Sequence, residues 1–479
     1  MTATPLSLLF AYFTVGFAAA FPAVACSYEL LRLGFTASEM ATVAVFASLP
    51  WCLKPIWGYV SDTFPVCGYR RRPYVCVFSL LTSVLLAATP QYALADATAS
   101  LVAVLACTSW ALCVVDVAVD GSVMTLVAAE RGADEEGKAQ THSWIARVGG
   151  GALAAGWSGW TYETVGFQTL MTGCALLPAA LCLAALRLPD TPPPSGRRRR
   201  ARRSSRRRPA SGRCRHLCGT VRTLLTVLWQ TRRVLFAAVV VAAIPETNTS
   251  MFFYLFSAHA TPKDMSLVDT AAALSSMLTL GAYNAVRPSH RGAFGLGVAL
   301  NALAAAVGAA MANDNVPWLL QGAAFQAALG SVGGALVLMP TVTLLGKAAA
   351  KTPHEATVYS CALSVLNLAS VVSEMISAAA MRRLHVTRGD VNNVRWYVGC
   401  VSVLTLLVVP VCACLPARAR DAYDALDTDA PQASQASLPL QPFALRGADS
   451  SDSSDDGDQD PPDDAPDDAQ DPGTQLPPV

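Results

Sequence analysis

The sequence predicts an all-α membrane protein with twelve transmembrane helices in two six-helix bundles, and three observations predict this fold class. First, 53% of the 479 residues are hydrophobic and only 14% are charged, which is too apolar for ordinary globular folding. Second, stretches of about 20 apolar residues, the length that crosses a bilayer core, recur over most of the chain. Third, six such stretches precede a long polar connection and six follow it.

The expected helices follow from these stretches, each of which is uncharged or nearly so. In chain order they span residues 5–28, 37–62, 73–94, 97–128, 139–162, 166–187, 233–257, 266–287, 292–312, 316–347, 355–381 and 394–415. The stretch at the N-terminus lacks the basic residues of a signal peptide and is expected to be the first membrane helix. Six helices, a connection and six helices form the layout of a major facilitator protein, whose substrate site is expected between the two bundles near the bilayer midplane.

This layout divides the chain into four parts: an N-terminal bundle (1–188), a basic cytoplasmic loop (189–232), a C-terminal bundle (233–416) and an acidic cytoplasmic tail (417–479). The loop contains the run RRRRARRSSRRRP, and the tail is rich in Asp, Pro, Ser and Gln. Like charges at this density prevent collapse into a core, so both segments are expected to be disordered. The basic residues at 197–215 anchor the topology or, alternatively, bind anionic lipids.

Lys and Arg set the orientation, because cytoplasmic loops retain them. They occupy alternate loops, which places both termini in the cytoplasm; these groups are Arg70–Arg72, Arg131 with Lys138, Arg197–Arg215, Arg287 with Arg291, and Lys347 with Lys351. The loop that carries Arg382, Arg383, Arg388 and Arg395 disagrees, and the majority decides. The plasma membrane is favoured, with an organellar membrane as the alternative.

Ionisable groups inside the expected helices are the candidates for function, since charge at membrane depth needs a partner, a cavity or a proton. Six stand out: Lys54, Asp116, Asp120, Arg147, Glu246 and Glu374. Two cations face four carboxylates, so complete pairing would still leave two carboxylates over. This excess favours proton coupling.

Asp116 and Asp120 are four residues apart, which puts both carboxylates on one helix face, about 6 Å apart along the axis. Repulsion between them would favour a proton on one, which makes a proton carrier. Alternatively, each pairs with a cation on a neighbouring helix, and Lys54 and Arg147 are the obvious partners. Arg147 precedes Gly149–Gly151, whose small size allows close helix approach, and its planar fork suits a carboxylate of the protein or of a substrate.

The loop after the second helix carries Asp62, Arg70, Arg71 and Arg72. Asp62 can accept hydrogen bonds from the N-terminus of a neighbouring helix, and the arginines can bind carboxylates across the boundary between the bundles. A contact made in only one conformation would act as a conformational latch for alternating access. The alternative, a plain topological anchor, accounts for the arginines but not for Asp62.

Catalysis is not indicated, because the sequence has no nucleophile, metal cluster or phosphate loop at a membrane face. No cofactor, metal or nucleic-acid partner is expected, and the protein is expected to act as a monomer. The fourteen cysteines lie in or beside apolar stretches without paired CxxC motifs, as small apolar residues do.

Five stretches resemble the folate-biopterin transporter family, a branch of the major facilitators. They are ASLPWCLKPIWGYVSDTFPVCGYRRRPY at 47–74, DVAVDG at 116–121, SWIARVGG at 143–150, MFFY at 251–254 and ATVYSCALSVLNLASVVS at 356–373. The resemblance implies uptake of folates, pterins or related solutes, coupled to protons. It also implies that Lys54, Asp116, Asp120 and Arg147 belong to the transport site, whereas Glu246 remains a candidate from the residues alone.

The chemistry of folate suits these residues, since a flat pterin with adjacent N–H donors is joined to a glutamate with two carboxylates. Asp116 or Asp120 could accept from the pterin, and Arg147 or Lys54 could hold the glutamate. Trp110, Trp144 or Phe253 could stack on the ring, with core packing as the alternative for each.

Two other functions stay open. One is transport of another organic anion or zwitterion, such as a nucleoside- or amino-acid-type metabolite. The other is a non-transporting membrane scaffold or sensor that uses the basic loop and the acidic tail to bind partners.

Overall fold

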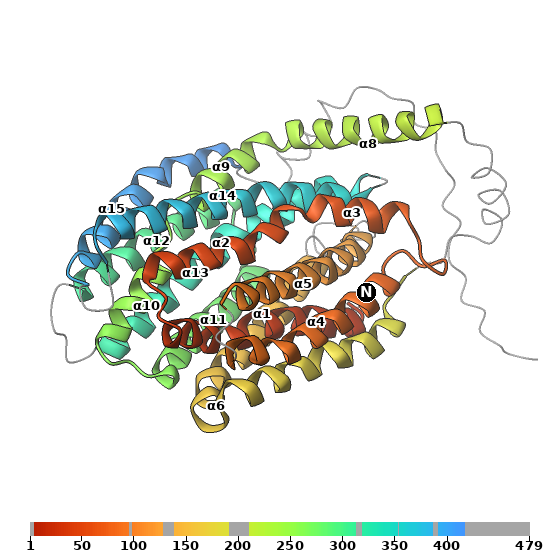
Figure 1. The fold of residues 1–479 in the computed structure, drawn as a ribbon. Helices are drawn as coiled ribbons and strands as arrows, with labels where there is room; N and C mark the ends of the chain where they lie inside the picture. Colours follow the sequence, from red (N-terminus) through yellow and green to blue (C-terminus); the bar gives the residue numbers. More distant parts are fainter. Residues whose placement is uncertain are drawn as a thin grey trace, which may run out of the picture. The chain divides into compact units, whose positions relative to one another are not determined.

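The computed structural model describes residues 4–94, 98–127, 138–190, 210–312, 319–352, 354–386 and 391–416. The basic run at 197–209 and the acidic tail lie outside these residues. The described chain is nearly all helical (Figure 1), and extended pairing within it is confined to one bridge between Val66 and Tyr69. The predicted all-α class is therefore confirmed.

The helices follow one another along the chain with short connections. In order they are α1 (Leu6–Arg32), α2 (Ala37–Cys52), α3 (Lys54–Thr63), α4 (Arg72–Leu94), α5 (Thr98–Val127), α6 (Lys138–Ala184), α8 (Ala210–Gln230), α9 (Arg232–Ala242), α10 (Asn248–Ser257), α11 (Pro262–Val286), α12 (His290–Met311), α13 (Leu319–Ala350), α14 (Glu355–Arg383) and α15 (Val394–Val408), with 3₁₀ turns at Ala185–Arg187 and Val409–Cys414.

The protein is an integral multi-pass membrane protein. Ten helical stretches of the described chain are long and apolar enough to cross a membrane, or eleven if the bent pair Gly219–Gln230 and Arg232–Ala242 counts as one span. Large apolar side chains such as Leu176, Leu278 and Leu407 are at least 70% exposed. A lipid environment accommodates such side chains, because the hydrocarbon around them is equally apolar.

Helix α6 covers two of the expected spans. Its 47 residues would extend about 70 Å as a straight helix, more than twice the thickness of a bilayer core. Two helices are joined within it across a kink at Gly166, where φ is 78° and ψ is 172°. Glycine adopts a positive φ without the clash that a Cβ would cause, so the chain can change direction there.

The expected span at 233–257 is broken. Helix α9 ends at Ala242 and α10 begins at Asn248, with Pro245 in the irregular segment between them. Proline has no backbone N–H to donate, which favours a break. Irregular backbone at membrane depth is tolerated where it is buried in protein or lines a cavity.

Residues 210–230 form helix α8, although they belong to the connection that was expected to be disordered. The reason is an apolar stripe: Leu224, Val227 and Leu228 recur at helical spacing and pack against the core of the described chain. Near Thr231 the chain bends by 75° into α9.

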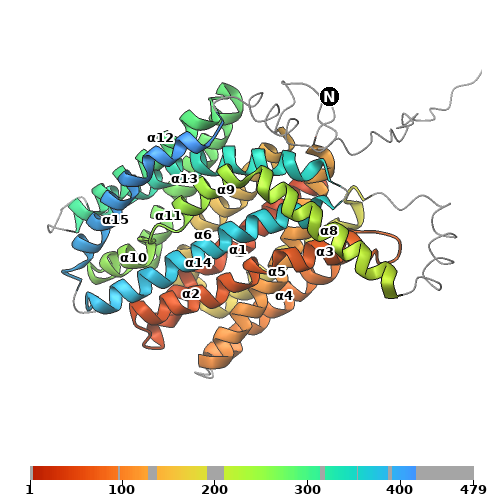
Figure 2. The ribbon, with the colours of Figure 1, turned by 90° about the horizontal axis from the view of Figure 1, so that it is seen from above.

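The helices form two groups that meet along two lines of contact (Figures 1 and 2). Helices α1, α4, α5 and α6 pack against one another, and so do α11, α12, α13 and α15. Between the groups, α6 packs along α11, and α14 packs along α2 and α3. We call these two lines the seams. The N-terminal half (α1–α6) and the C-terminal half (α9–α15) contact each other there.

Helices α1 and α6 approach each other closely at the level of Arg147. A Cβ on Gly150 would fall on the carbonyl oxygen of Phe13, and one on Gly16 would fall on the carbonyl oxygen of Arg147. Of the three glycines at 149–151, Gly150 is the one that makes this contact. The close approach fixes the height of Arg147 relative to α1.

Candidate functional site

Two cations and two carboxylates from three helices meet in the N-terminal half, and we call them the charged cluster. Lys54 begins α3, directly after the break at Leu53, and its Nζ lies 2.5 Å from Asp116 Oδ2 on α5. Arg147 of α6 donates through Nη1 to the other oxygen, Asp116 Oδ1. Four of the predicted residues, Asp120 included, are therefore together, and both oxygens of Asp116 are engaged.

Asp120 lies one helical turn beyond Asp116 and is less completely bonded. Its Oδ1 accepts a hydrogen bond of 2.5 Å from the hydroxyl of Tyr12 on α1. Its Oδ2 is 3.7 Å from Lys54 Nζ, within range of an ion pair but too far for a hydrogen bond. Within the described chain this buried oxygen has no hydrogen-bond donor.

The charged cluster is formally neutral and almost completely buried. Lys54, Asp116 and Asp120 are each exposed by 4% or less, whereas the Arg147 side chain is 19% exposed. Removing charges from water costs several kcal/mol per ion and is tolerated when the charges are paired and hydrogen-bonded. Arg147 is therefore the member of the cluster that a ligand can reach.

Trp51 covers the cations and ties the cluster to the other half. Its ring lies 4.8 Å from Lys54 Nζ and 5.7 Å from the Arg147 guanidinium carbon, within the range of cation–π attraction. Its indole N–H donates to Ser109, and its carbonyl oxygen accepts from Asn367 Nδ2 of α14 at 2.9 Å. The sequence analysis did not single out Trp51.

Three neighbouring cavities surround Trp51, and each pair of them shares lining residues. The cluster cavity, about 310 Å³, is lined by the charged cluster and by residues of the C-terminal half such as Asn367. The α1–α2 cavity, about 570 Å³, extends from Trp51 to Leu30 and Met40. The α11 cavity, about 710 Å³, is lined by Glu246, Asp269 and residues of α12 and α13. These volumes are in the range of small-molecule sites.

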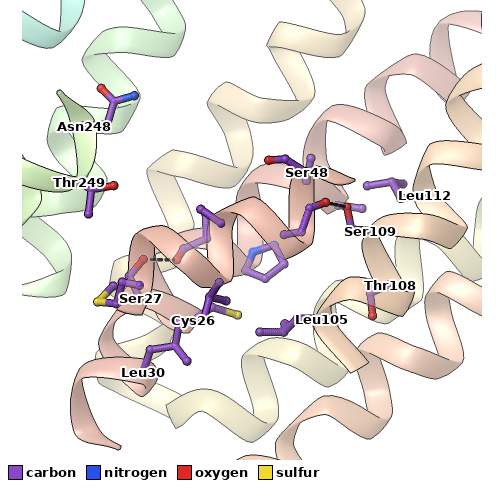
Figure 3. A pocket seen from close by; sticks show the side chains of 18 of the residues that line it. Cys26, Ser27, Leu30, Ser48, Leu105, Thr108, Ser109, Leu112, Asn248 and Thr249 are labelled. Atoms are coloured by element: carbon purple, nitrogen blue, oxygen red, sulfur yellow. Dashed lines mark hydrogen bonds between the residues drawn. The ribbon is translucent and has the colours of Figure 1, made fainter. Parts of the chain in front are cut away.

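Figure 3 shows the α1–α2 cavity from close by. Cys26 and Ser27 come from α1, Thr108 and Ser109 from α5, and Thr249 from α10, so both halves contribute to its wall. Its lining combines apolar side chains with a few hydroxyls, as is usual for sites that bind organic molecules.

One contact between the halves lies where α3 meets the start of α14. Asp62 accepts hydrogen bonds from the backbone N–H of Thr357 at 3.0 Å and from its hydroxyl at 2.7 Å. Arg71 Nη2 lies 3.3 Å from Asp62 and 3.2 Å from Glu355, so it connects the two carboxylates. Gly121 on α5 leaves space for the guanidinium, because a Cβ there would overlap Arg71 Nη1.

The three consecutive arginines have different positions. Arg71 is buried and reaches the C-terminal half. Arg72 stays in its own half, where Nε donates to the carbonyl of Leu188 at 2.6 Å and the backbone N–H to Asp190 at 3.0 Å. Arg70 is exposed. Arg71 is thus the member of the triplet that lies at the seam.

A second contact between the halves lies at the kink of α6 and the start of α11. Glu163 accepts from the backbone N–H of Lys263 at 3.0 Å, and the Lys263 Nζ lies 2.8 Å from its other oxygen. Nearby, the hydroxyl of Ser266 accepts a hydrogen bond from the backbone N–H of Gly159, and Tyr28 donates to the carbonyl of Ala260 at 2.8 Å.

The other predicted residues divide between the cavities and the core. Glu246 lines the α11 cavity and accepts from the backbone N–H of Thr249 at 3.2 Å, and Trp144 lines the cluster cavity. Glu374 on α14 accepts from Ser48 at 3.2 Å.

Two of the predicted stacking residues do not line any of these cavities. Trp110 packs edge-on against Trp57 and Phe78, with ring centroids 5.5 and 5.3 Å away. Phe253 is fully buried in the core, whereas its neighbour Phe252 lines the α1–α2 cavity. The helix phase decides between these neighbours, since one residue turns the side chain by about 100°.

Several site residues were missed. Asp269, a lone acid in an apolar helix, carried the same signal as Asp116 and could have been found. Tyr12, Trp51 and Glu355 carry no such signal, because tyrosine and tryptophan are common in membrane helices and Glu355 begins α14 at its end. Among the described residues, no group of three or more His, Cys, Asp or Glu could hold a metal ion.

Comparison with known proteins gives matches over most of the chain. The sequence model of the BT1 family matches residues 15–436. The folate-biopterin transporter of Synechocystis sp. is 26% identical over 81% of this chain and 76% of its own length. The probable folate-biopterin transporter 4 of Arabidopsis thaliana is 29% identical over 38% of this chain and 37% of its own length.

The fold is also found in a solved structure. A crystal structure of a mutant of the nucleoside transporter NupG superimposes with a TM-score of 0.57, covering 85% of this chain and 99% of that one. The two sequences are 13% identical, so the similarity shows a shared fold alone.

Proposed function

Because the chain belongs to the BT1 family, we propose that it is a secondary active transporter that imports folate, biopterin or related pteridines by proton symport. One observation carries the proposal: a neutral, buried cluster of charges opens onto a cavity lined by both halves of the chain. Charges at membrane depth that serve packing alone are costly, whereas a transport site uses them.

In this proposal Arg147 binds a carboxylate of the substrate. Its side chain is the most exposed in the cluster, and its guanidinium offers a planar fork of donors that matches a carboxylate. Trp51 and Trp144 lie within 5.7 Å of that guanidinium and line the same cavity, so they are the aromatic side chains available to the flat part of the substrate.

Asp120 is the proposed proton carrier. Asp116 is held by two cations, whereas Asp120 has one oxygen that receives no hydrogen bond within the described chain. A proton on Asp120 would leave the charged cluster with one net positive charge, which attracts an anionic substrate to Arg147. Proton binding and substrate binding would thereby favour each other.

The proposed architecture has twelve transmembrane helices in two six-helix bundles of the major facilitator type, at 1–188 and 233–416, in a monomer with both termini in the cytoplasm. Dividing α6 at Gly166 and treating α9 and α10 as one broken helix adds two spans to the ten. The shared fold with a nucleoside transporter supports this count. The basic residues at 197–215 then lie beside the headgroups of anionic lipids.

The contact of Asp62, Arg71 and Glu355 with Thr357 is the proposed conformational latch on the cytoplasmic side. The α1–α2 cavity extends from Trp51 to Leu30 and Met40, where α1 ends and α2 begins, and so away from this contact. A transporter closed at the cytoplasmic end and accessible from the other end is in its outward-facing state.

Uptake of labelled folate into proteoliposomes, with and without an inward acid gradient, tests the function. We expect accumulation that the gradient accelerates. Equal uptake with and without the gradient would remove proton symport from the proposal, and no uptake of folate or biopterin would remove the substrate class.

The two alternatives make different predictions. A transporter of another organic anion or zwitterion would carry a solute whose uptake excess folate and biopterin leave unchanged. A scaffold or sensor would lose its role when the basic loop and the acidic tail are deleted, whereas a transporter would keep its flux.

A further inference from the structure

The C-terminal half contains a carboxylate that the charged cluster does not use. Asp269 lies on α11, a helix apolar enough to cross a membrane. Its side chain is exposed rather than buried, and it lines both the α1–α2 cavity and the α11 cavity. Asp269 therefore lies where the two larger cavities adjoin.

Asp269 has neither an ion pair nor a hydrogen bond with any other residue that the structure describes. In the same part of the chain, Asp116 has two cations, Asp120 has Tyr12, and Glu246 has the backbone N–H of Thr249. An unpaired carboxylate at membrane depth is costly and marks a functional position. Both of its oxygens are available to a ligand.

Three amide side chains line the α11 cavity together with Asp269. Asn248 begins α10, Asn301 lies on α12 and Gln326 on α13, so four helices of one half contribute. Amides both donate and accept hydrogen bonds, whereas a carboxylate only accepts. This set complements a flat heterocycle that has donors along one edge and acceptors beside them.

The charged cluster cannot take such an edge in the same way. Two adjacent N–H donors need two free acceptor oxygens, and the oxygens of Asp116 are held by Lys54 and Arg147. Asp120 has one oxygen bonded to Tyr12. The expectation that Asp116 or Asp120 accepts from the pterin ring therefore conflicts with their bonding.

We infer that Asp269 binds the N–H donor edge of the substrate heterocycle, while Arg147 binds its carboxylate end. This inference rests on the proposed function and assigns a ligand group to each half of the chain. It makes Asp269 the residue that selects heterocycles with adjacent N–H donors. A substrate held by both halves would also couple its binding to their relative movement.

Three solutes separate the two ends of the substrate. Folate has both ends, biopterin has only the heterocycle, and p-aminobenzoylglutamate has only the carboxylate end. Uptake of labelled folate and biopterin, and inhibition of folate uptake by p-aminobenzoylglutamate, are measured for the wild type and for Asp269→Asn. The control is Asp264→Asn on the same helix, where the carboxylate closes a capping box with Thr261.

For Asp269→Asn we expect the KM of folate and biopterin to rise roughly tenfold or more, because a charged acceptor is lost. Inhibition by p-aminobenzoylglutamate should stay unchanged, as should all three measurements for Asp264→Asn. An unchanged KM for biopterin in Asp269→Asn overturns the inference. So does an unchanged KM with loss of acceleration by an acid gradient, which would make Asp269 a proton site. If the wild type takes up neither folate nor biopterin, the proposed function and the inference both fall.

Discussion

Asp62 and Thr357, which are 295 positions apart in the sequence, are joined by two hydrogen bonds, one from the backbone amide and one from the hydroxyl of Thr357. Thr357 lies in the first turn of α14, where backbone N–H groups have no partner within the helix. The carboxylate thus satisfies a helix N-terminus of the opposite half, and the helix dipole favours its negative charge.

The same arrangement occurs at the second contact between the halves. Glu163 accepts from the backbone N–H of Lys263 at the start of α11. In both contacts an acid of the N-terminal half binds the first turn of a helix in the C-terminal half. Such contacts can separate without exposing apolar core, because water can replace the acid at each helix end.

The buried arginine at the Asp62 contact should matter more than its exposed neighbour. We expect Arg71→Ala to reduce the initial uptake rate about tenfold or more, since removing one partner of a buried ion pair costs about 3–5 kcal/mol. Arg70→Ala is the matched control and should retain uptake within about twofold, because exposed charges contribute about 0–1 kcal/mol. Equal loss in both variants would contradict a latch at Arg71 and favour a general effect of positive charge.

The charged cluster should depend on neutrality. Lys54→Met leaves one net negative charge in a buried site, and we expect a clear loss of thermal stability in detergent. Adding Asp120→Asn restores neutrality, so the double variant should be more stable than Lys54→Met alone. A double variant whose losses simply add would show that the charges do not act together.

The proton carrier should be separable from the remaining carboxylates. We expect uptake by Asp120→Asn to be insensitive to an inward acid gradient, because its side chain cannot bind the transported proton. Glu374→Gln, which alters a carboxylate bonded to Ser48 outside the charged cluster, should keep the acceleration. If both variants respond to the gradient as the wild type does, Asp120 is not the carrier.

The close approach of α1 and α6 should not tolerate a methyl group. We expect Gly16→Ala to destabilise the protein by about 1–3 kcal/mol, since its Cβ would overlap the backbone carbonyl of Arg147. Gly281→Ala on α11 is the control, because no atom lies within 4 Å of a Cβ there. Thermal unfolding in detergent compares the two. Similar melting temperatures would show that the helices can separate at no cost.

Much of the fold could be predicted because the signals are local. Long apolar stretches predict membrane helices from composition alone, and the five matching stretches pointed to the family that the comparison shows. Helix α8 was missed, because the arginines nearby concealed the stripe of Leu224, Val227 and Leu228. The break before Asn248 was missed because Pro245 alone does not determine whether a helix kinks or stops.

The site could be predicted in its residue types but not in its bonding. Intramembrane charge identified Lys54, Asp116, Asp120 and Arg147, since burial makes such residues costly at any position. The angular position of Phe252 and Phe253 relative to the cavity depends on how α10 is rotated, and both are equally aromatic in the sequence.

The sequence by itself determined the membrane class, the family resemblance and the supply of charges within the bilayer, because each depends on composition or on short segments. Only the tertiary structure decided that Asp116 is held by both Lys54 and Arg147, that Arg71 rather than Arg70 or Arg72 reaches the other half, and that Asp269 stays unpaired within the described chain. Pairing depends on the rotation and depth of helices far apart in the chain, and close backbone contacts such as that between Gly16 and Arg147 fix both.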